Sequence, residues 1–303
     1  MNATYDLIVV GEGIAGLTCA AESAKVGLQV ATFESAFFGG LAVNIYELKN
    51  FKEAGGLSGM DHAGMLASGN KKAGVKSSPT AVTAVRIIEG GFEVDTHAGK
   101  HTARFVVIAS GAHLKKLNVP GEMEFEGRGV SHCADCDAPM FTESDVIVAG
   151  SGDWALQDAL LLARECTKVH VVYEEKELTA CAEYIQRVKN EPKIILQPNL
   201  KIYEILGNDN GMTGVRVTDA QDTTSEISAK GLFAIVGLIP NSALAPVEVA
   251  RDDHGFLQVN EDLETVVPGL WAIGQVRSGF QGWLNHAVGD ARRVAEIVKD
   301  RTS

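Results

Sequence analysis

The chain has 303 residues, of which 46% are hydrophobic, and a formal net charge of -12. That length allows about two domains with cores of their own, and the acidity excludes nucleic acid as a partner, because phosphate binding needs clustered Lys and Arg. The sequence contains no apolar run of about 20 residues and no basic leader, so we expect neither a membrane span nor a signal peptide. Five cysteines do not indicate a secreted disulfide framework, which favours a reducing cytoplasm.

The first predicted element is a strand, a helix and a second strand that together form a dinucleotide-binding unit. An apolar run over 7–10 predicts a buried parallel strand, and it leads into Gly11-x-Gly13-x-x-Gly16. These glycines permit a tight turn and bring a pyrophosphate close to a helix N-terminus. The second strand ends at Glu34, where a carboxylate accepts hydrogen bonds from a ribose.

Two short apolar strands that end in glycine, over 101–113 and 231–240, are predicted crossover points between domains. A Cys-x-x-Cys pair, Cys133 and Cys136, lies between them. Such a pair can bind a metal, exchange electrons or do neither. Structural zinc needs about four ligands, whereas only His132 lies beside this pair, so we expect a redox-active dithiol and no metal. The other three cysteines lie in predicted helices and are expected to act as small apolar residues: Cys19, Cys166 and Cys181.

The plan of the first element is repeated after the cysteine pair. A strand over 145–149 precedes Gly150-x-Gly152-x-x-Ala155, which is followed by a helix and a strand over 168–173. Two such units on one chain predict two dinucleotides, one a flavin and the other a nicotinamide. Near the C-terminus, residues 265–298 predict a closing strand followed by a long helix.

In this order, the motifs GxGxxG, FFGG, IASGA, CADCD, GSGDWALQDA, GLFAIVGLIPN and PGLWAIG resemble the low-molecular-weight thioredoxin reductases. These belong to the class II pyridine nucleotide-disulfide oxidoreductases, and the resemblance runs from Tyr5 to about Val298. It implies an α/β fold of two Rossmann-like dinucleotide-binding domains, the second inserted in the first. The FAD-binding domain would comprise 1–113 and 241–303, and the nicotinamide-type domain with the cysteine pair 114–240. The resemblance also implies FAD, a homodimer and a swivel between the domains.

The resemblance implies roles for individual residues as well. Cys136 is expected to face the flavin, Cys133 to attack an external disulfide, and Asp137 to act as the acid–base carboxylate. The expected FAD-binding residues are Gly11, Gly13, Gly16, Glu34, Gly39, Gly40, Gly111, Gly274 and Gln275. The expected nicotinamide-binding residues are Gly150, Gly152, Ala155 and Glu174.

The chain departs from the family pattern where the electron donor would bind. Two arginines that hold the 2'-phosphate of NADPH in the family align with Glu174 and Glu175. Each carboxylate close to a phosphate dianion costs about 1 kcal/mol even in water, so NADPH is disfavoured. A carboxylate favours a ribose 2'-OH, so we expect NADH; the alternative is a vestigial nucleotide site with two solvated glutamates.

Three further departures fall near the expected flavin. Gln275 stands where the family has an Asp that binds the ribityl chain, and Leu41 replaces a common Gln. The family's Arg-Gln pair before the last helix aligns with Gly282 and Trp283. An indole at this place would alter stacking on the flavin, unless it is a core residue. These changes indicate an unusual electron donor or dithiol partner.

We therefore expect an enzyme, an FAD-dependent disulfide oxidoreductase. NADH would reduce FAD, FAD would reduce Cys133–Cys136, and the dithiol would reduce a thioredoxin-like protein or a small disulfide. The first alternative is a nicotinamide-independent dithiol oxidase that passes electrons from a small dithiol or lipoyl-type group to oxygen. The second is a flavoprotein reduced by ferredoxin.

Overall fold

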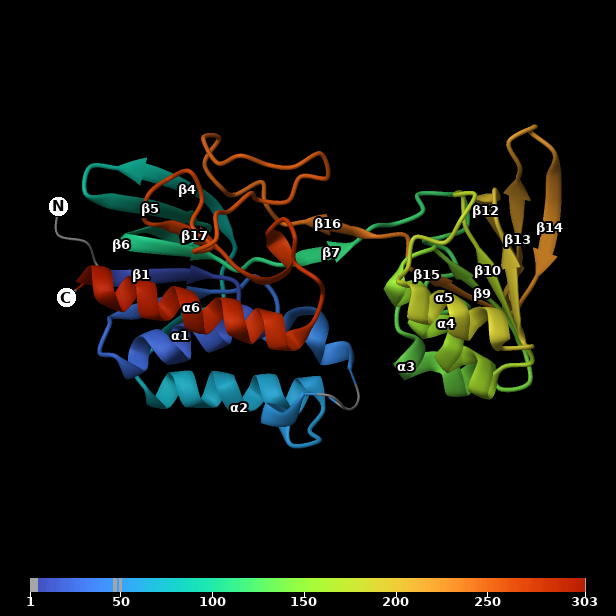
Figure 1. Ribbon diagram of the computed structural model, residues 1–303, viewed down its shortest axis with the longest axis horizontal. Coiled ribbons are helices and arrows are strands. Elements are labelled where there is room, and N and C mark those ends of the chain that lie inside the picture. The colour runs from blue at the N-terminus through green and yellow to red at the C-terminus, as the bar shows by residue number, and fades with distance from the viewer. Residues whose placement is uncertain (1–4, 46–47, 49–50, 303) are drawn as a thin grey trace. The chain divides into compact units, whose positions relative to one another are not determined.

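The computed structural model describes residues 5–45, 48 and 51–302 and divides the chain into two compact units (Figure 1). Unit 1 consists of Met1–His113 with Ile239–Ser303, and unit 2 consists of Leu114–Leu238. The segments that lead into and out of unit 2, β7 (Ala112–Leu114) and β16 (Leu238–Pro240), pair as a two-stranded sheet. In sequence, unit 2 is therefore an insertion in unit 1.

Unit 1 is built on a seven-stranded sheet in the order β3-β2-β1-β6-β5-β4, with β17 paired to β6. Its strands are β1 (Tyr5–Val10), β2 (Val30–Phe33), β3 (Lys76–Ser78), β4 (Val82–Ile88), β5 (Gly91–Thr96), β6 (Gly99–Ile108) and β17 (Leu270–Ala272). Strands β3, β2, β1, β6 and β17 are parallel, whereas β4 and β5 are antiparallel to their neighbours. Val10 pairs with both Phe33 and Ile108, so three strands end at the same sheet edge.

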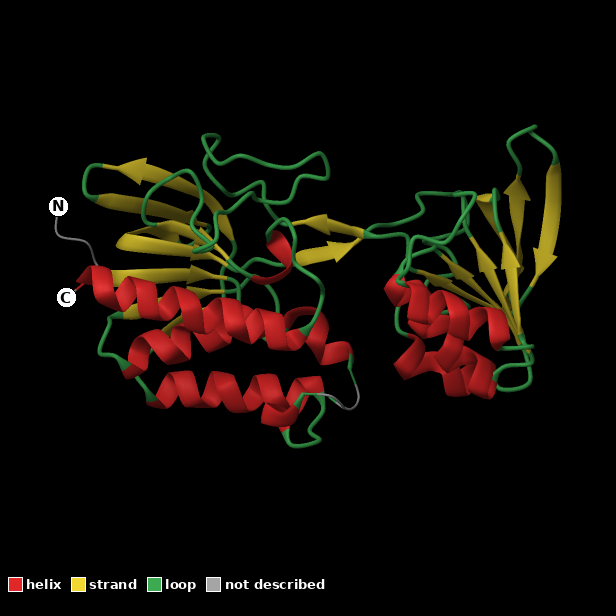
Figure 2. Ribbon diagram, viewed as in Figure 1, coloured by secondary structure: helices red, strands yellow, loops and turns green. Residues whose placement is uncertain are grey.

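The helices of unit 1 lie on one face of this sheet (Figure 2). They are α1 (Ile14–Lys25), α2 (Gly59–Lys72) and α6 (Leu284–Thr302), with short 3-10 turns η1 (Gly40–Asn44), η2 (Lys52–Ala54) and η4 (Gly274–Val276). Leu7 and Val9 of β1 pack toward α1 and α6, and Ile8 and Val10 pack into a second apolar cluster. Burial on both faces explains why β1 is continuously apolar rather than alternating.

Unit 2 has three layers (Figure 2). The central parallel sheet has the order β11-β10-β9-β15-β8: β11 (Ile194–Gln197), β10 (Lys168–Val172), β9 (Asp145–Ala149), β15 (Gly231–Ala234) and β8 (Val130–Ser131). One face carries α3 (Ala134–Asp137), η3 (Ala138–Phe141), α4 (Asp153–Glu165) and α5 (Ala182–Asn190). The other face carries an antiparallel sheet of β12 (Lys201–Asn208), β13 (Gly211–Thr218) and β14 (Thr224–Ser228). Each unit therefore contains a strand–helix–strand core, and the predicted fold with two Rossmann-like units is confirmed.

Two features are absent from the described residues. No helix within 5–45, 48 and 51–302 is long and apolar enough to cross a membrane. Over the same residues, no group of three or more His, Cys, Asp and Glu side chains could hold a metal ion.

The third glycine of the first motif permits α1 to pack directly on the loop that precedes it. A Cβ at Gly16 would lie 2.0 Å from the carbonyl oxygen of Gly11 and 3.3 Å from the Cβ of Ala109. No L side chain fits there without moving the backbone.

Gly16→Ala is therefore expected to lower the free energy of unfolding by about 1–3 kcal/mol, the usual cost of overpacking. The control is Gly69→Ala in α2, where a Cβ would meet nothing within 4 Å. That change is expected to raise stability by up to about 1 kcal/mol, because Ala favours a helix over Gly. Urea denaturation measures both variants, and equal effects would contradict the packing argument.

Candidate active site

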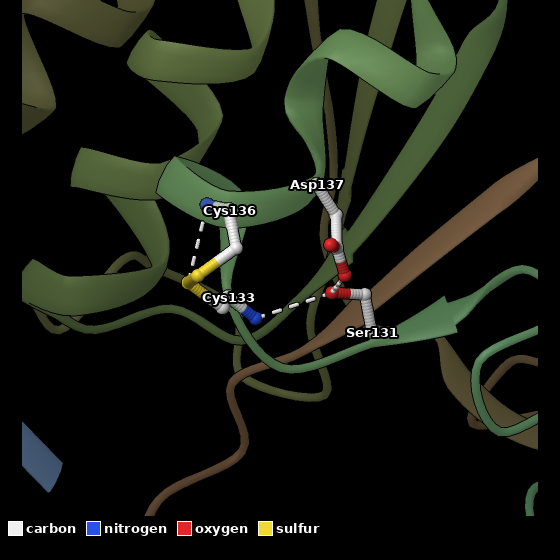
Figure 3. Close-up of a disulfide and its surroundings, with 4 residues drawn as sticks. All are labelled: Ser131, Cys133, Cys136 and Asp137. Atoms are coloured by element: carbon white, nitrogen blue, oxygen red, sulfur yellow. Dashed lines mark hydrogen bonds between the residues drawn. A yellow bond between two sulfur atoms is a disulfide. The ribbon is translucent and has the colours of Figure 1, made fainter. Parts of the chain in front are cut away.

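Cys133 and Cys136 form a disulfide at the start of α3, with their Cα atoms 5.3 Å apart (Figure 3). Cys133 is the N-cap residue of this single turn, and the backbone N–H of Cys136 donates to the Sγ atom of Cys133 at 3.2 Å. Cys136 is exposed and Cys133 is half-buried. An N–H aimed at the sulfur stabilises negative charge there once the disulfide opens, which is what thiol–disulfide exchange requires.

Asp137 is held beside the disulfide by Ser131, the last residue of β8. The Ser131 hydroxyl donates to Asp137 Oδ2 at 2.6 Å and accepts the backbone N–H of Cys133 at 3.2 Å (Figure 3). This chain of hydrogen bonds fixes the carboxylate relative to the first cysteine. Sequence reasoning missed Ser131; its position two residues before Cys133, at the end of an apolar strand, was the available signal.

His132, next to the pair, lies close to a glutamate, and two of the other three cysteines are buried. His132 Nε2 lies 3.2 Å from a Glu126 carboxylate oxygen. Burial raises the pKa of the Cys19 thiol to about 12 and that of Cys166 to about 11. These two thiols are therefore poor nucleophiles at neutral pH. Cys181 is exposed, so the expectation that it acts as a small apolar residue is wrong.

The first glycine motif forms one edge of a cavity in unit 1. Gly11 has a φ of +105°, and a Cβ on it would lie 2.4 Å from the carbonyl oxygen of Ala109. Glu34 accepts the backbone N–H of Glu12 at 2.9 Å and that of Ala36 at 3.0 Å. The cavity has a volume of about 270 Å³ and is lined by Val10, Gly11, Phe33, Glu34, Ser35, Ala81, Val82, Ser110, Asn241 and Leu244.

The second pair of glycines, Gly39 and Gly40, is held against the first motif. Gly39 has a φ of +102°, and its N–H donates to the carbonyl oxygen of Glu12 at 2.6 Å. A Cβ on Gly40 would lie 3.4 Å from the Cα of Gly13, whereas a Cβ on Gly13 would meet nothing within 4 Å. The turn at Gly39 and Gly40 therefore lies close to one side of the first glycine loop, and the side toward which a Cβ on Gly13 would point is open.

Gly111 and Gly274 follow strands that end at the same edge, because Ile108 pairs with both Val10 and Ala272. A Cβ on Gly274 would lie 3.0 Å from that of Ala15 at the start of α1. The structure thus gathers the predicted FAD-binding residues at one sheet edge, with an open glycine loop, a cavity and a carboxylate. These residues fit a dinucleotide such as FAD.

An ion pair that sequence reasoning missed supports the loop containing Gly274 and Gln275. Asp290 of α6 accepts the Gly274 N–H at 3.0 Å and the Arg277 guanidinium at 2.7 Å and 2.9 Å. The Asp290 side chain is only 9% exposed and that of Arg277 15%. Trp283 is 49% exposed, so the alternative that it is a core residue is wrong.

The second glycine motif lies between β9 and α4. Gly150 has a φ of +139°, and a Cβ on it would lie 2.3 Å from the carbonyl oxygen of Ile235. Gly152 is the N-cap of α4, and Ala155 is buried in its first turn. The carbonyl oxygen of Ser151 accepts the N–H groups of Thr179 and Ala180, which fixes the segment after β10 next to this loop.

The two units have the same strand register but differ in the residue that follows the second strand. Val10 pairs with Phe33 in unit 1, and Ala149 pairs with Val172 in unit 2. The residue that matches Glu34 is therefore Tyr173, which is 6% exposed and whose pKa is raised by burial and by Glu175. Glu174 lies one residue further along the chain, and both it and Glu175 are exposed.

Comparison with known proteins gives a consistent result. Residues 5–291 match the family described as pyridine nucleotide-disulphide oxidoreductase. Thioredoxin reductase of Treponema pallidum is 32% identical over 280 residues, which is 92% of this chain and 91% of that protein. The crystal structure of Lactococcus lactis thioredoxin reductase has a TM-score of 0.86 at 28% identity, covering 98% of each chain. That of T. acidophilum thioredoxin reductase has a TM-score of 0.84 at 28% identity and the same coverage.

Asp290→Asn tests the support of the Gln275 loop. Removing the charge leaves the Arg277 guanidinium buried without its counter-ion, at a cost of about 3 kcal/mol in unfolding free energy. We expect FAD to dissociate from this variant during dialysis when the native protein retains it, measured by flavin absorbance per chain. The control is Asp262→Asn, which breaks an ion pair whose side chains are both 53% exposed and should cost under about 1 kcal/mol. Equal flavin retention by both variants would contradict the role given to Asp290.

Proposed function

The chain belongs to the pyridine nucleotide-disulphide oxidoreductase family, and we propose that it moves electron pairs between bound FAD and an external disulfide through Cys133–Cys136. It is a thioredoxin reductase-like, flavin-dependent disulfide oxidoreductase. The observation that carries the proposal is the disulfide at the start of α3, with Asp137 tied to it through Ser131. In this proposal unit 1 binds FAD and unit 2 is the nicotinamide-type domain.

FAD, when bound, supplies a two-electron centre. Two electrons break the bond between the sulfurs, and protonation of one sulfur leaves a thiol and a thiolate. Asp137 is placed to hold and pass that proton, because Ser131 orients its carboxylate. A Cys133 thiolate attacks one sulfur of the external disulfide, forms a mixed disulfide with it and displaces the partner's other sulfur as a thiolate. Cys136 then attacks Cys133, which restores the internal disulfide and releases the partner's second sulfur as a thiol.

We propose a thioredoxin-like protein as the partner, because the similar proteins are thioredoxin reductases. A homodimer is the assembly implied by the same resemblance. A dithiol that must cycle, together with free thiols at Cys19, Cys166 and Cys181, favours a reducing cytoplasm.

For the electron donor we propose NADH rather than NADPH. The exposed carboxylates of Glu174 and Glu175 follow β10 directly, and the end of β10 is held next to the glycine loop because the Gly150 N–H donates to the carbonyl oxygen of Val172. They would repel a 2'-phosphate dianion, whereas NADH carries hydroxyls there that can donate to a carboxylate.

A second candidate is a nicotinamide-independent dithiol oxidase, in which a small dithiol or lipoyl-type group reduces Cys133–Cys136 and oxygen accepts the electrons from FAD. Buried Tyr173, at the position that Glu34 occupies in unit 1, favours it. A dinucleotide whose ribose is bound by a carboxylate at this position would find no carboxylate there.

Anaerobic mixing of the holoenzyme with NADH or NADPH, followed by flavin absorbance, distinguishes the donors. We expect NADH to bleach the flavin faster than NADPH. Glu174→Arg with Glu175→Arg should raise the NADPH-to-NADH rate ratio by more than about tenfold, since two repulsions of about 1 kcal/mol each are removed. The control is Glu124→Arg, at an exposed glutamate outside this segment. Bleaching by dithiols alone would support the oxidase, and bleaching by neither would favour a ferredoxin-type donor.

Serine variants test the dithiol. Cys136→Ser is expected to retain FAD and lose disulfide turnover, because no sulfur remains to resolve the mixed disulfide. Cys133→Ser should lose turnover and show a long-wavelength charge-transfer band, since a free Cys136 would then face oxidised flavin. Cys181→Ser, at an exposed cysteine outside the pair, should keep full turnover. The dithiol assignment is wrong if both pair variants also keep it.

A further inference from the structure

One buried carboxyl group of unit 2, that of Asp158, lies behind the turn that carries the disulfide. Asp158 belongs to α4, which packs against α3, and the residue is only 9% exposed. It accepts a hydrogen bond from the backbone N–H of Ala134, and its Oδ2 atom has no hydrogen-bond partner. The bonded N–H belongs to the peptide that joins Cys133 to Ala134. The carboxyl group is therefore connected directly to the backbone of the redox pair.

The surroundings of Asp158 are apolar because the same face of α4 belongs to the core. Ala155 and Leu162, three residues before and four residues after Asp158, are fully buried in one cluster. Ala134 and Ala138, on either side of the second cysteine, belong to that cluster too. A carboxylate with an unpaired oxygen is costly in such a place, and a protonated carboxyl is much less so.

Burial raises the pKa of Asp158 from 3.8 to about 7, and the negative charge of Asp135 raises it as well. Asp135 is exposed and stands between the two cysteines. The other ionisable groups on the elements packed against α4 are Asp137, Asp145, Lys168, His170, Glu183, Tyr184, Arg187 and Lys189. None of these eight is among the causes of the shift.

We propose that the Asp158 carboxyl group takes up a proton when the Cys133–Cys136 disulfide is reduced and releases it when the disulfide re-forms. In the reduction, two electrons and two protons convert the disulfide and the Asp158 carboxylate into one thiol, one thiolate and one neutral carboxyl. The electrons come from bound FAD, so this inference rests on the proposed function. The thiolate and the carboxylate repel each other across the Cys133–Ala134 peptide, which couples the two charges.

A purely structural role would be different, since the carboxyl could serve only as an acceptor for the Ala134 N–H. Asp158→Asn separates the two roles, because the amide oxygen keeps that acceptor and the side chain no longer titrates. Asp135→Asn is a second test at an exposed position and does not depend on the buried site tolerating a change. Glu165→Gln, at the exposed C-terminal end of α4, is the control.

The experiment equilibrates the holoenzyme with dithiothreitol redox buffers from pH 5.5 to 8.5 and measures the reduced fraction of the pair by alkylation and mass spectrometry. In the native protein, the number of protons taken up per electron pair should change near pH 7. Asp158→Asn should lose that change. If reduction of the disulfide shifts the pKa of Asp158 by one unit, the ratio of reduced to oxidised pair in this variant should be about tenfold higher than in the native protein at pH 8.5 and equal to it at pH 5.5. Asp135→Asn should move the change to lower pH, and Glu165→Gln should leave it in place.

A pH profile of Asp158→Asn identical to that of the native protein would overturn the inference. If Asp158→Asn does not fold, an unmoved profile in Asp135→Asn overturns it instead. Redox buffers do not need turnover, so the two proposals fail separately. If the number of protons changes near pH 7 but the protein reduces no external disulfide, the proposed function alone is contradicted. If turnover is full but the number of protons does not change, the inference alone is contradicted.

The pH dependence of stability provides a further readout. Between pH 3.8 and about 7, the folded chain keeps a proton on Asp158, whereas the unfolded chain has released it. The native protein should therefore lose stability relative to Asp158→Asn as pH rises through this window. A constant difference in urea midpoint from pH 4.5 to 7.5 would show that Asp158 does not titrate there.

Discussion

The hydrogen bond from the Ser131 hydroxyl to Asp137 links the sulfur pair to the carboxylate that we propose as its proton carrier. It joins the end of β8 to the end of α3, and Cys133 donates its N–H to the same hydroxyl. A four-residue turn has too few internal hydrogen bonds to hold two sulfurs and a carboxylate in one arrangement. The contacts with Ser131 and with α4 provide that rigidity.

The two units use the same strand–helix–strand plan, yet their glycine loops lie in different chemical surroundings. In unit 1 the loop contacts Glu34 and opens onto a cavity, as binding a dinucleotide requires. In unit 2 the matching residue is Tyr173, and the loop carbonyl at Ser151 is bonded to the backbone of Thr179 and Ala180. Likeness of fold therefore does not make the two sites equivalent.

Negative charge is a common feature of the functional part of unit 2. Asp135 and Asp137 lie on the redox turn, and Asp158 is buried behind it. Glu174 and Glu175 are exposed after β10. Like charges disfavour a phosphate dianion at the exposed glutamates, whereas burial, together with the charge of Asp135, disfavours a carboxylate at Asp158.

The sequence by itself determined the fold class, the two glycine motifs and the Cys-x-x-Cys pair, because apolar runs and glycine spacings are local signals. It could not identify Asp290 or Asp158, whose partners lie on other segments of the fold. Those contacts, and the burial that changes the pKa of Asp158, exist only when distant segments pack together, so the tertiary structure alone decided them.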